Sequence, residues 1–134
     1  MKVVMKKYLF LLFILFIAFS CKKGNVIPRA GLTGKWELRI MSGGISGATT
    51  NYAAGNGNTL QFNADSTFAQ YQNFHLVNQG TYSIVKNGGA IIGLTNQDAL
   101  YYNHLFSGVM QLNGNTLIVR DNVDDGFIST YVRQ

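Results

Sequence analysis

Gly34-Lys35-Trp36-Glu37-Leu38-Arg39-Ile40 is the stretch that decides the fold. From position 35 to position 40, charged side chains at odd positions alternate with apolar ones at even positions. Successive side chains of a β-strand point to opposite faces of its sheet, so this pattern predicts a half-buried strand. We expect Trp36, Leu38 and Ile40 to face a core and Glu37 to face solvent.

Seven further stretches combine β-branched and aromatic residues and are bounded by Gly, Asn and Asp, which is typical of strands. They are 59–62, 67–74, 80–85, 90–94, 104–112, 116–120 and 127–133. No segment of this region offers a long apolar period of 3.6 residues, the pattern of an amphipathic helix. Eight strands that each turn straight back predict an all-β fold, an up-and-down antiparallel eight-stranded barrel without free sheet edges.

The predicted connections between these strands differ in length. The tight ones are 63–66, 86–89 and 113–115, the long ones are 42–58 and 96–103, and the intermediate ones are 75–79 and 122–126. Odd and even connections of an up-and-down barrel lie at opposite ends, so we expect the long loops to surround one open mouth. The segment 42–58 is long for a compact domain, which makes it either a functional loop or a disordered one.

The N-terminus has the features of a secretory leader. Lys2, Lys6 and Lys7 precede twelve apolar or aromatic residues at 8–19. A helix of that length spans about 18 Å, whereas crossing a bilayer core of about 30 Å takes roughly 20 residues. The pattern therefore predicts a cleaved signal peptide at 1–20.

Ala18-Phe19-Ser20-Cys21 resembles the lipobox of bacterial lipoproteins. The resemblance implies cleavage before Cys21 and a lipid anchor on its thiol, with acyl chains such as palmitate. Cys21 is the only cysteine, so an intramolecular disulfide is excluded. The alternative is a secreted protein whose cysteine is incidental. Lys22 and Lys23 follow instead of Asp, which in lipoproteins favours the outer membrane of the bacterial cell envelope.

Residues 21–30, which include Pro28, are predicted to form a lipidated tether, and 31–134 a single domain. Three of the eleven basic residues lie in the leader, so eight basic and six acidic residues leave a net charge of +2. Because no basic stripe is present, we expect no nucleic-acid partner.

Gly34-Lys35-Trp36 resembles the Gly-x-Trp signature of the lipocalins, and Arg133 resembles the arginine that packs on that tryptophan. The resemblance implies structural roles for Gly34, Trp36 and Arg133, with a cation–π contact worth about 0.5–2 kcal/mol at the barrel base. Together with the lipobox, the chain resembles small lipocalin-like bacterial lipoproteins. That group implies a membrane-anchored barrel that binds a small apolar ligand or lipid.

Five side chains are candidate ligand-binding residues. Tyr52, His75, Tyr101 and Tyr102 are expected near the open end of the barrel, and His104, like the mixed strand 67–74, favours a partly polar interior. Tyrosine supplies both apolar area and a hydroxyl group, which suits a pocket or a protein contact. The alternative is that these tyrosines are ordinary surface residues and that the barrel core is filled. An alternative function is then an envelope interaction module that binds a protein or glycan through its loops.

Sequence motifs for catalysis are absent. His75 and His104 lack the spacing of a metal motif, no Gly-x-Ser-x-Gly occurs, and Cys21 is assigned to the lipid. The acidic segment 121–126 lacks the alternating oxygen ligands of a calcium loop. We therefore expect no enzyme activity, no catalytic residue, no metal site and no cofactor.

Overall fold

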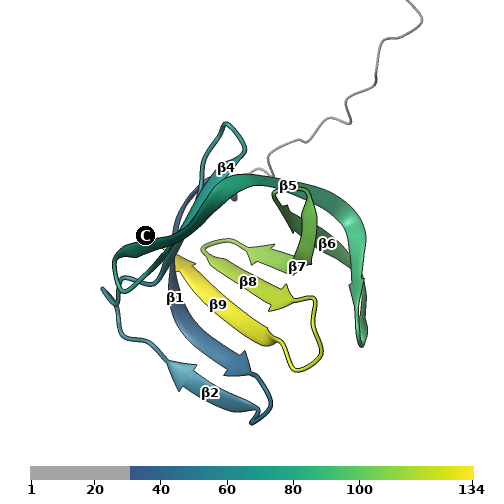
Figure 1. The fold of residues 1–134 in the computed structure, drawn as a ribbon, viewed down its shortest axis with the longest axis horizontal. Helices are drawn as coiled ribbons and strands as arrows, with labels where there is room; N and C mark the ends of the chain where they lie inside the picture. The colour runs from purple at the N-terminus through teal and green to yellow at the C-terminus, as the bar shows by residue number, and fades with distance from the viewer. Residues whose placement is uncertain (1–30) are drawn as a thin grey trace, which may run out of the picture.

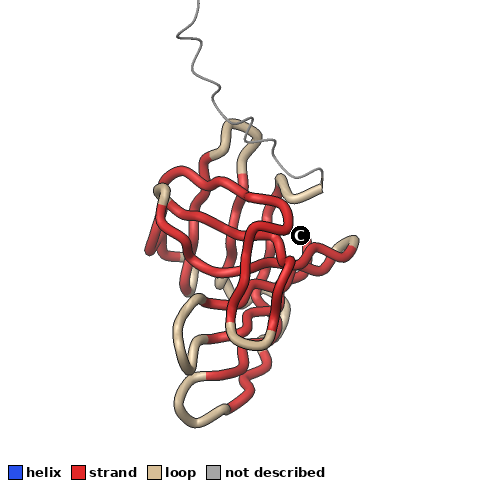
Figure 2. Tube along the Cα trace, turned by 90° about the vertical axis from the view of Figure 1, so that its right-hand side faces the viewer, coloured by secondary structure: helices blue, strands red, loops and turns tan. Residues whose placement is uncertain are grey.

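The computed structural model describes residues 31–134, which form an all-β fold (Figures 1 and 2). The predicted leader at 1–20 and the tether at 21–30, with Cys21, lie outside the described residues. Within residues 31–134, no helix has the length and apolar character needed to span a membrane.

The described chain contains nine strands. Their bounds are β1 Gly34–Gly43, β2 Ala48–Asn51, β3 Thr59–Phe62, β4 Thr67–Gln72, β5 His75–Ile91, β6 Leu94–Tyr102, β7 Leu105–Asn113, β8 Thr116–Asp121 and β9 Phe127–Arg133.

All neighbouring strands pair antiparallel in the order β2-β1-β3-β4-β5-β6-β7-β8-β9, and β1 also pairs with β9. The β1–β9 pairing closes β1 and β3 to β9 into an eight-stranded barrel. β2 is additional: it pairs with positions 40–43 of β1, whereas β3 pairs with positions 34–37 on the same edge. The predicted up-and-down barrel is therefore confirmed, with one extra strand.

The segment 42–58 is not a single loop, because β1 continues to Gly43 and β2 forms a short hairpin with it. The remaining residues of this segment are tied to the barrel. The backbone N–H of Tyr52 donates to Arg39 O at 2.8 Å, and that of Leu38 donates to Asn58 O at 2.9 Å. These hydrogen bonds order a stretch whose composition alone indicated a loop.

The strands around β5 differ from the prediction. The expected connection 75–79 and the expected turn 86–89 both lie inside β5, and the expected connection 96–103 lies mainly in β6. β5 tolerates the Gly and Asn residues because its pairing with β6 shifts register on both sides of Gly89. The turn between β5 and β6 lies at 92–93 instead.

The alternation in β1 is broken by a register shift against β9 between Leu38 and Ile40. Trp36 and Leu38 are buried as predicted, but Ile40 is exposed, so its predicted inward orientation is wrong. A β-bulge adds one residue to a strand and reverses which face the later side chains occupy. Met41 consequently packs against the core in place of Ile40.

Glu37 was expected to face solvent, yet only 2% of its surface is exposed. The segment 52–58 covers it. Its Oε1 accepts a hydrogen bond from the Gly55 N–H at 2.8 Å, and its Oε2 lies 3.1 Å from the Arg39 guanidinium. A buried carboxylate needs such partners, and here both are present.

The hydrophobic core fills one end of the barrel, which we call the base. Its largest fully buried side chains include Trp36, Phe62, Phe68 and Leu32. Leu32 precedes β1 and is completely buried, so the start of the domain acts as a plug. Gly31, the first described residue, also lies at the base, where it approaches Leu112.

Candidate functional site

The opposite end of the barrel, the mouth, contains a cavity of about 560 Å³. Its apolar wall consists of side chains from β1, β3, β8 and β9: Leu38, Met41, Leu60, Val119 and Phe127. Its amide wall comes from the end of the 52–58 segment, β4, the turn after it and β5: Asn58, Gln70, Gln72, Asn73 and Asn78. The barrel core is therefore filled at the base and open at the mouth.

The amide wall follows from the sequence of β4 and its turn. Phe68 and Gln70 alternate with Ala69 on the strand, so Phe68 enters the core and Gln70 faces the cavity above it. Asn58 fixes the turn after β4, because its side-chain oxygen accepts a hydrogen bond from the Asn73 N–H at 3.0 Å. The positions of the amide groups thus depend on the alternation along β4 and on the hydrogen bond that holds the turn after it.

The rest of the lining consists of four tyrosines, one carboxylate and three hydroxyl residues: Tyr52, Tyr71, Tyr102, Tyr131, Asp121, Thr59, Ser107 and Ser129. The Tyr102 ring stacks on Phe68 with ring centroids 4.1 Å apart, so it forms part of the floor between core and cavity. Burial raises the pKa of the Tyr102 phenol, and the nearby Tyr131 and Asp121 raise it further. Burial likewise raises the pKa of Tyr131. Both phenols are therefore neutral hydrogen-bonding groups at physiological pH.

The five candidate residues from the sequence fall into two groups. Tyr52 and Tyr102 line the cavity. Tyr101, which directly precedes Tyr102 in β6, does not line the cavity and packs against Phe106 with ring centroids 5.4 Å apart. His75 is exposed at the start of β5, and His104 is exposed in the 103–104 turn; neither histidine lines the cavity.

Several lining residues were missed from the sequence, notably Gln70, Asn58 and Tyr131. A signal for Gln70 was present, because the stretch 67–74 mixes Phe and Gln on one face, which already indicated a partly polar interior. No comparable local signal marks Asn58, since it reaches the mouth through hydrogen bonds to distant residues.

At the base, the Arg133 guanidinium lies over the Trp36 ring, 4.2 Å from its centroid, which is the contact that the lipocalin resemblance implies. The guanidinium also donates to Thr33 O at 2.9 Å and to Gly31 O. Trp36 Nε1–H donates to Leu32 O at 2.8 Å. Gly34 leaves the space for this arrangement: a Cβ there would meet Arg133 Nη1 at 2.6 Å, and its φ of 137° disfavours other residues.

Within the part of the chain that the structure describes, no group of three or more His, Cys, Asp or Glu side chains is placed to hold a metal ion. What the mouth offers chemically is a recessed surface with apolar, amide and phenol groups.

Comparisons of the chain with models of protein families, with curated protein sequences and with solved structures find no significant match.

Proposed function

We propose that this protein is a lipid-anchored lipoprotein of the bacterial cell envelope whose barrel binds a small amphipathic ligand, such as a lipid, in the mouth cavity. The observation that carries the proposal is the cavity of about 560 Å³ between an apolar wall and an amide wall. Small-molecule sites typically measure about 300–1,000 Å³ and combine apolar surface with a few polar groups.

Under this proposal, the apolar and polar parts of the ligand would contact opposite walls of the cavity. Leu38, Leu60 and Val119 belong to the packed core and present apolar surface at the cavity floor. Gln70 and Asn78 offer amide donors and acceptors on the other side. An apolar chain would gain by leaving water at the first wall, while hydroxyl or carbonyl groups would hydrogen-bond to the second.

The test is native mass spectrometry of protein purified from its own host, compared with a variant whose cavity is filled. Ser107 lines the cavity, so Ser107→Trp is expected to block it and abolish the co-purifying ligand. Ser46 is exposed and outside the cavity, so Ser46→Trp serves as the matched control and should retain the ligand. Absence of any ligand in the parent protein, or equal loading of Ser107→Trp, would contradict the proposal.

The anchor is tested separately. The lipobox resemblance at Cys21 predicts that the mature protein carries acyl chains on its first residue and sediments with outer membranes. Cys21→Ser should release the protein into the soluble envelope fraction. A mature N-terminus elsewhere, or an unmodified Cys21, would contradict the anchor while leaving ligand binding untouched.

A second function, an interaction module, is favoured by exposed apolar side chains on two hairpins. Phe74 and Leu76 at the β4–β5 hairpin are 74% and 49% exposed, and Leu105 after the 103–104 turn is 74% exposed. The Asn103 N–H donates to Thr81 O at 2.8 Å, which joins the β6–β7 turn to β5 at the end of its pairing with β4 that lies away from Phe74 and Leu76. A photo-crosslinking residue at Leu105 should capture one defined envelope partner on cells, and capture of none would argue for ligand binding alone.

A further inference from the structure

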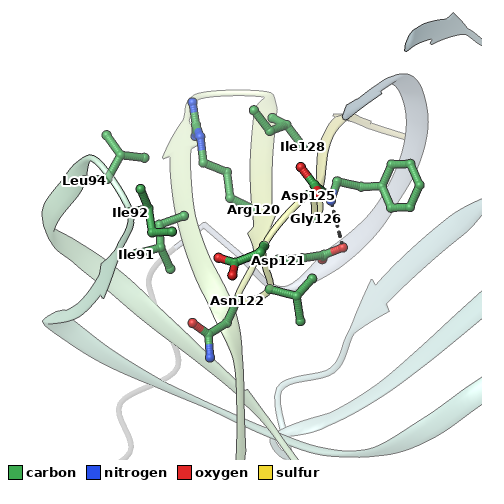
Figure 3. A pocket seen from close by; sticks show the side chains of 12 residues that line it. Ile91, Ile92, Leu94, Arg120, Asp121, Asn122, Asp125, Gly126 and Ile128 are labelled. Carbon is green, nitrogen blue, oxygen red and sulfur yellow. Dashed lines mark hydrogen bonds between the residues drawn. The ribbon is translucent and has the colours of Figure 1, made fainter. Parts of the chain in front are cut away.

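A second concave site lies outside the barrel, between the tip of the β5–β6 hairpin and the turn that joins β8 to β9 (Figure 3). This outer groove has a volume of about 880 Å³. Ile91, Ile92 and Leu94 form its hairpin side, and Arg120 and the 121–128 segment form the other (Figure 3).

The hairpin is held over the outer face of the barrel by close packing. A Cβ added at Gly89 would lie 2.6 Å from the Val109 side chain and 3.2 Å from the Ala99 backbone. Val109 and Ala99 are almost completely buried although they do not belong to the barrel core. The groove is therefore built by the β5–β6 hairpin, whose tip brings Ile91, Ile92 and Leu94 opposite β8.

Arg120 is the chemically unusual member of this groove. Its Nη1 atom is buried and has no hydrogen-bond partner, the only such side-chain atom among residues 31–134. No ion pair or hydrogen bond links its guanidinium to another described residue. Figure 3 shows the side chain extending away from the Asp121 carboxylate, whose Oδ2 instead accepts a hydrogen bond from the Phe127 N–H at 3.2 Å. Arg120 as a whole is half-buried, but a buried guanidinium nitrogen without a partner is unfavourable, and an anion bound to this guanidinium would supply one.

The surroundings select the kind of anion. Ile92 is 88% exposed and Ile128 is 37% exposed, so apolar surface is available on both sides of Arg120. Asp121, Asp124 and Asp125 also line the groove, and their charges repel a polyanion more strongly than a monoanion. We propose that the outer groove binds an alkyl carboxylate, with the carboxylate on the Arg120 guanidinium and the chain against Ile91, Ile92 and Leu94.

This site borders the mouth cavity, with which it shares Asp121 and Phe127, but its other lining residues are different. Arg120 and Ile92 do not line the mouth, and the apolar wall residues Leu38 and Leu60 do not line the groove. The inference goes beyond the proposed function and does not depend on it, because the groove could be occupied whether or not a ligand enters the barrel.

Methyl-detected NMR titration locates and measures binding in one experiment. With decanoate as the probe, we expect the largest shifts at the methyl groups of Ile91, Ile92 and Ile128. Decanol, which has the same chain without the charge, should bind about tenfold more weakly or worse, since a charge-assisted hydrogen bond is lost. Undetectable decanoate binding, equal binding of decanol, or shifts confined to Leu38 and Leu60 would each overturn the proposal.

Variants extend the test to the groove residues. Arg120→Met should weaken decanoate binding by about tenfold or more, while Ile92→Ser should weaken it without affecting folding, because Ile92 is exposed. Ile45 is 96% exposed and outside the groove, so Ile45→Ser is the matched control and should leave the affinity unchanged. Unchanged affinity in both groove variants, or an equal loss in the control, would contradict the assignment.

Discussion

The base and the mouth of this barrel are built from the same strands, but the base is filled with apolar side chains and the mouth is open and partly polar. At the base, Leu32 plugs the barrel, Trp36 is completely buried, and Arg133 ties the plug to the last strand. At the mouth, the inward positions carry amides and phenols around an open cavity. Apolar closure therefore supplies stability at one end, and incomplete filling leaves the other end free to bind.

The two ends also differ in how their chain segments are held. The base relies on side-chain packing and on the guanidinium of Arg133, whereas the segment 52–58 at the mouth is held by hydrogen bonds to the bulged part of β1. Each core side chain at the base packs against many others, whereas each hydrogen bond of the segment 52–58 joins only two residues. Changes at the base should therefore alter the stability of the whole barrel, and changes at the mouth should alter local order and binding.

The largest expected effect follows from Trp36→Ala. Removing this completely buried side chain should lower the free energy of unfolding by about 3–5 kcal/mol, because transfer energy is lost and a cavity remains. Urea unfolding followed by circular dichroism measures it. Tyr52→Ala at the mouth is the comparison and should have a clearly smaller effect; an equal loss would remove the distinction between the two ends.

The next effect is expected for Glu37→Ala, which removes the acceptor of the Gly55 N–H and the partner of Arg39. The unfolding free energy should fall by about 1–3 kcal/mol. Hydrogen exchange should accelerate at Gly55 more than in the core strands. Lys35→Ala, on the same face of β1 and exposed, is the control and should change stability by less than about 0.5 kcal/mol.

Arg133→Met tests the tie between the plug and the last strand. Loss of the cation–π contact with Trp36 and of the hydrogen bonds to Thr33 and Gly31 should lower the unfolding free energy by about 1–2 kcal/mol. Arg133→Lys keeps the charge but not the planar fork, so we expect an intermediate value. Equal stability of the parent and Arg133→Met would show that apolar packing alone closes the base.

The smallest effect concerns pH at the mouth. The pKa of Tyr102 is raised in the folded protein above the unfolded value of about 10, so its stabilising effect is complete below pH 10 and is lost as the pH rises further. One such group lowers stability by up to about 1.4 kcal/mol per pH unit in that range. Tyr102→Phe should flatten the decline of the melting temperature between about pH 10 and pH 11. Identical profiles for both proteins would show that Tyr102 does not contribute.

The alternating pattern at 34–40 predicted the first strand, and the seven further strand-like stretches predicted the barrel, because alternation and turn signals act over short distances. The pairing of Trp36 with Arg133 could also be anticipated through the lipocalin resemblance. The position of Ile40 could not, since the bulge in β1 depends on its register with β9 and on the segment 52–58.

The wrong predictions of strand bounds and turns around β5 also arise because pairing with distant strands is not visible in the local sequence. Asn87-Gly88-Gly89 is a strong local turn signal, yet Gly89 pairs with Gln97 inside a continuous hairpin. Long-range pairing overrode the local preference and moved the turn to 92–93. The amide wall was only partly predictable, because Gln70 alternates with apolar residues on one strand whereas Asn58 reaches the mouth from another part of the chain.

Gly31 lies at the base, so the chain that precedes it joins the barrel at that end and not at the mouth. Ten residues separate Gly31 from the start of the mature chain predicted at Cys21, and an extended chain covers at most about 3.6 Å per residue. Under the proposed anchor at Cys21, the attachment lies at the end opposite the mouth, and the tether keeps Gly31 within about 36 Å of the bilayer. Attachment at this end leaves the mouth unobstructed by the tether, so under the same proposal a ligand could enter it from the aqueous space of the envelope.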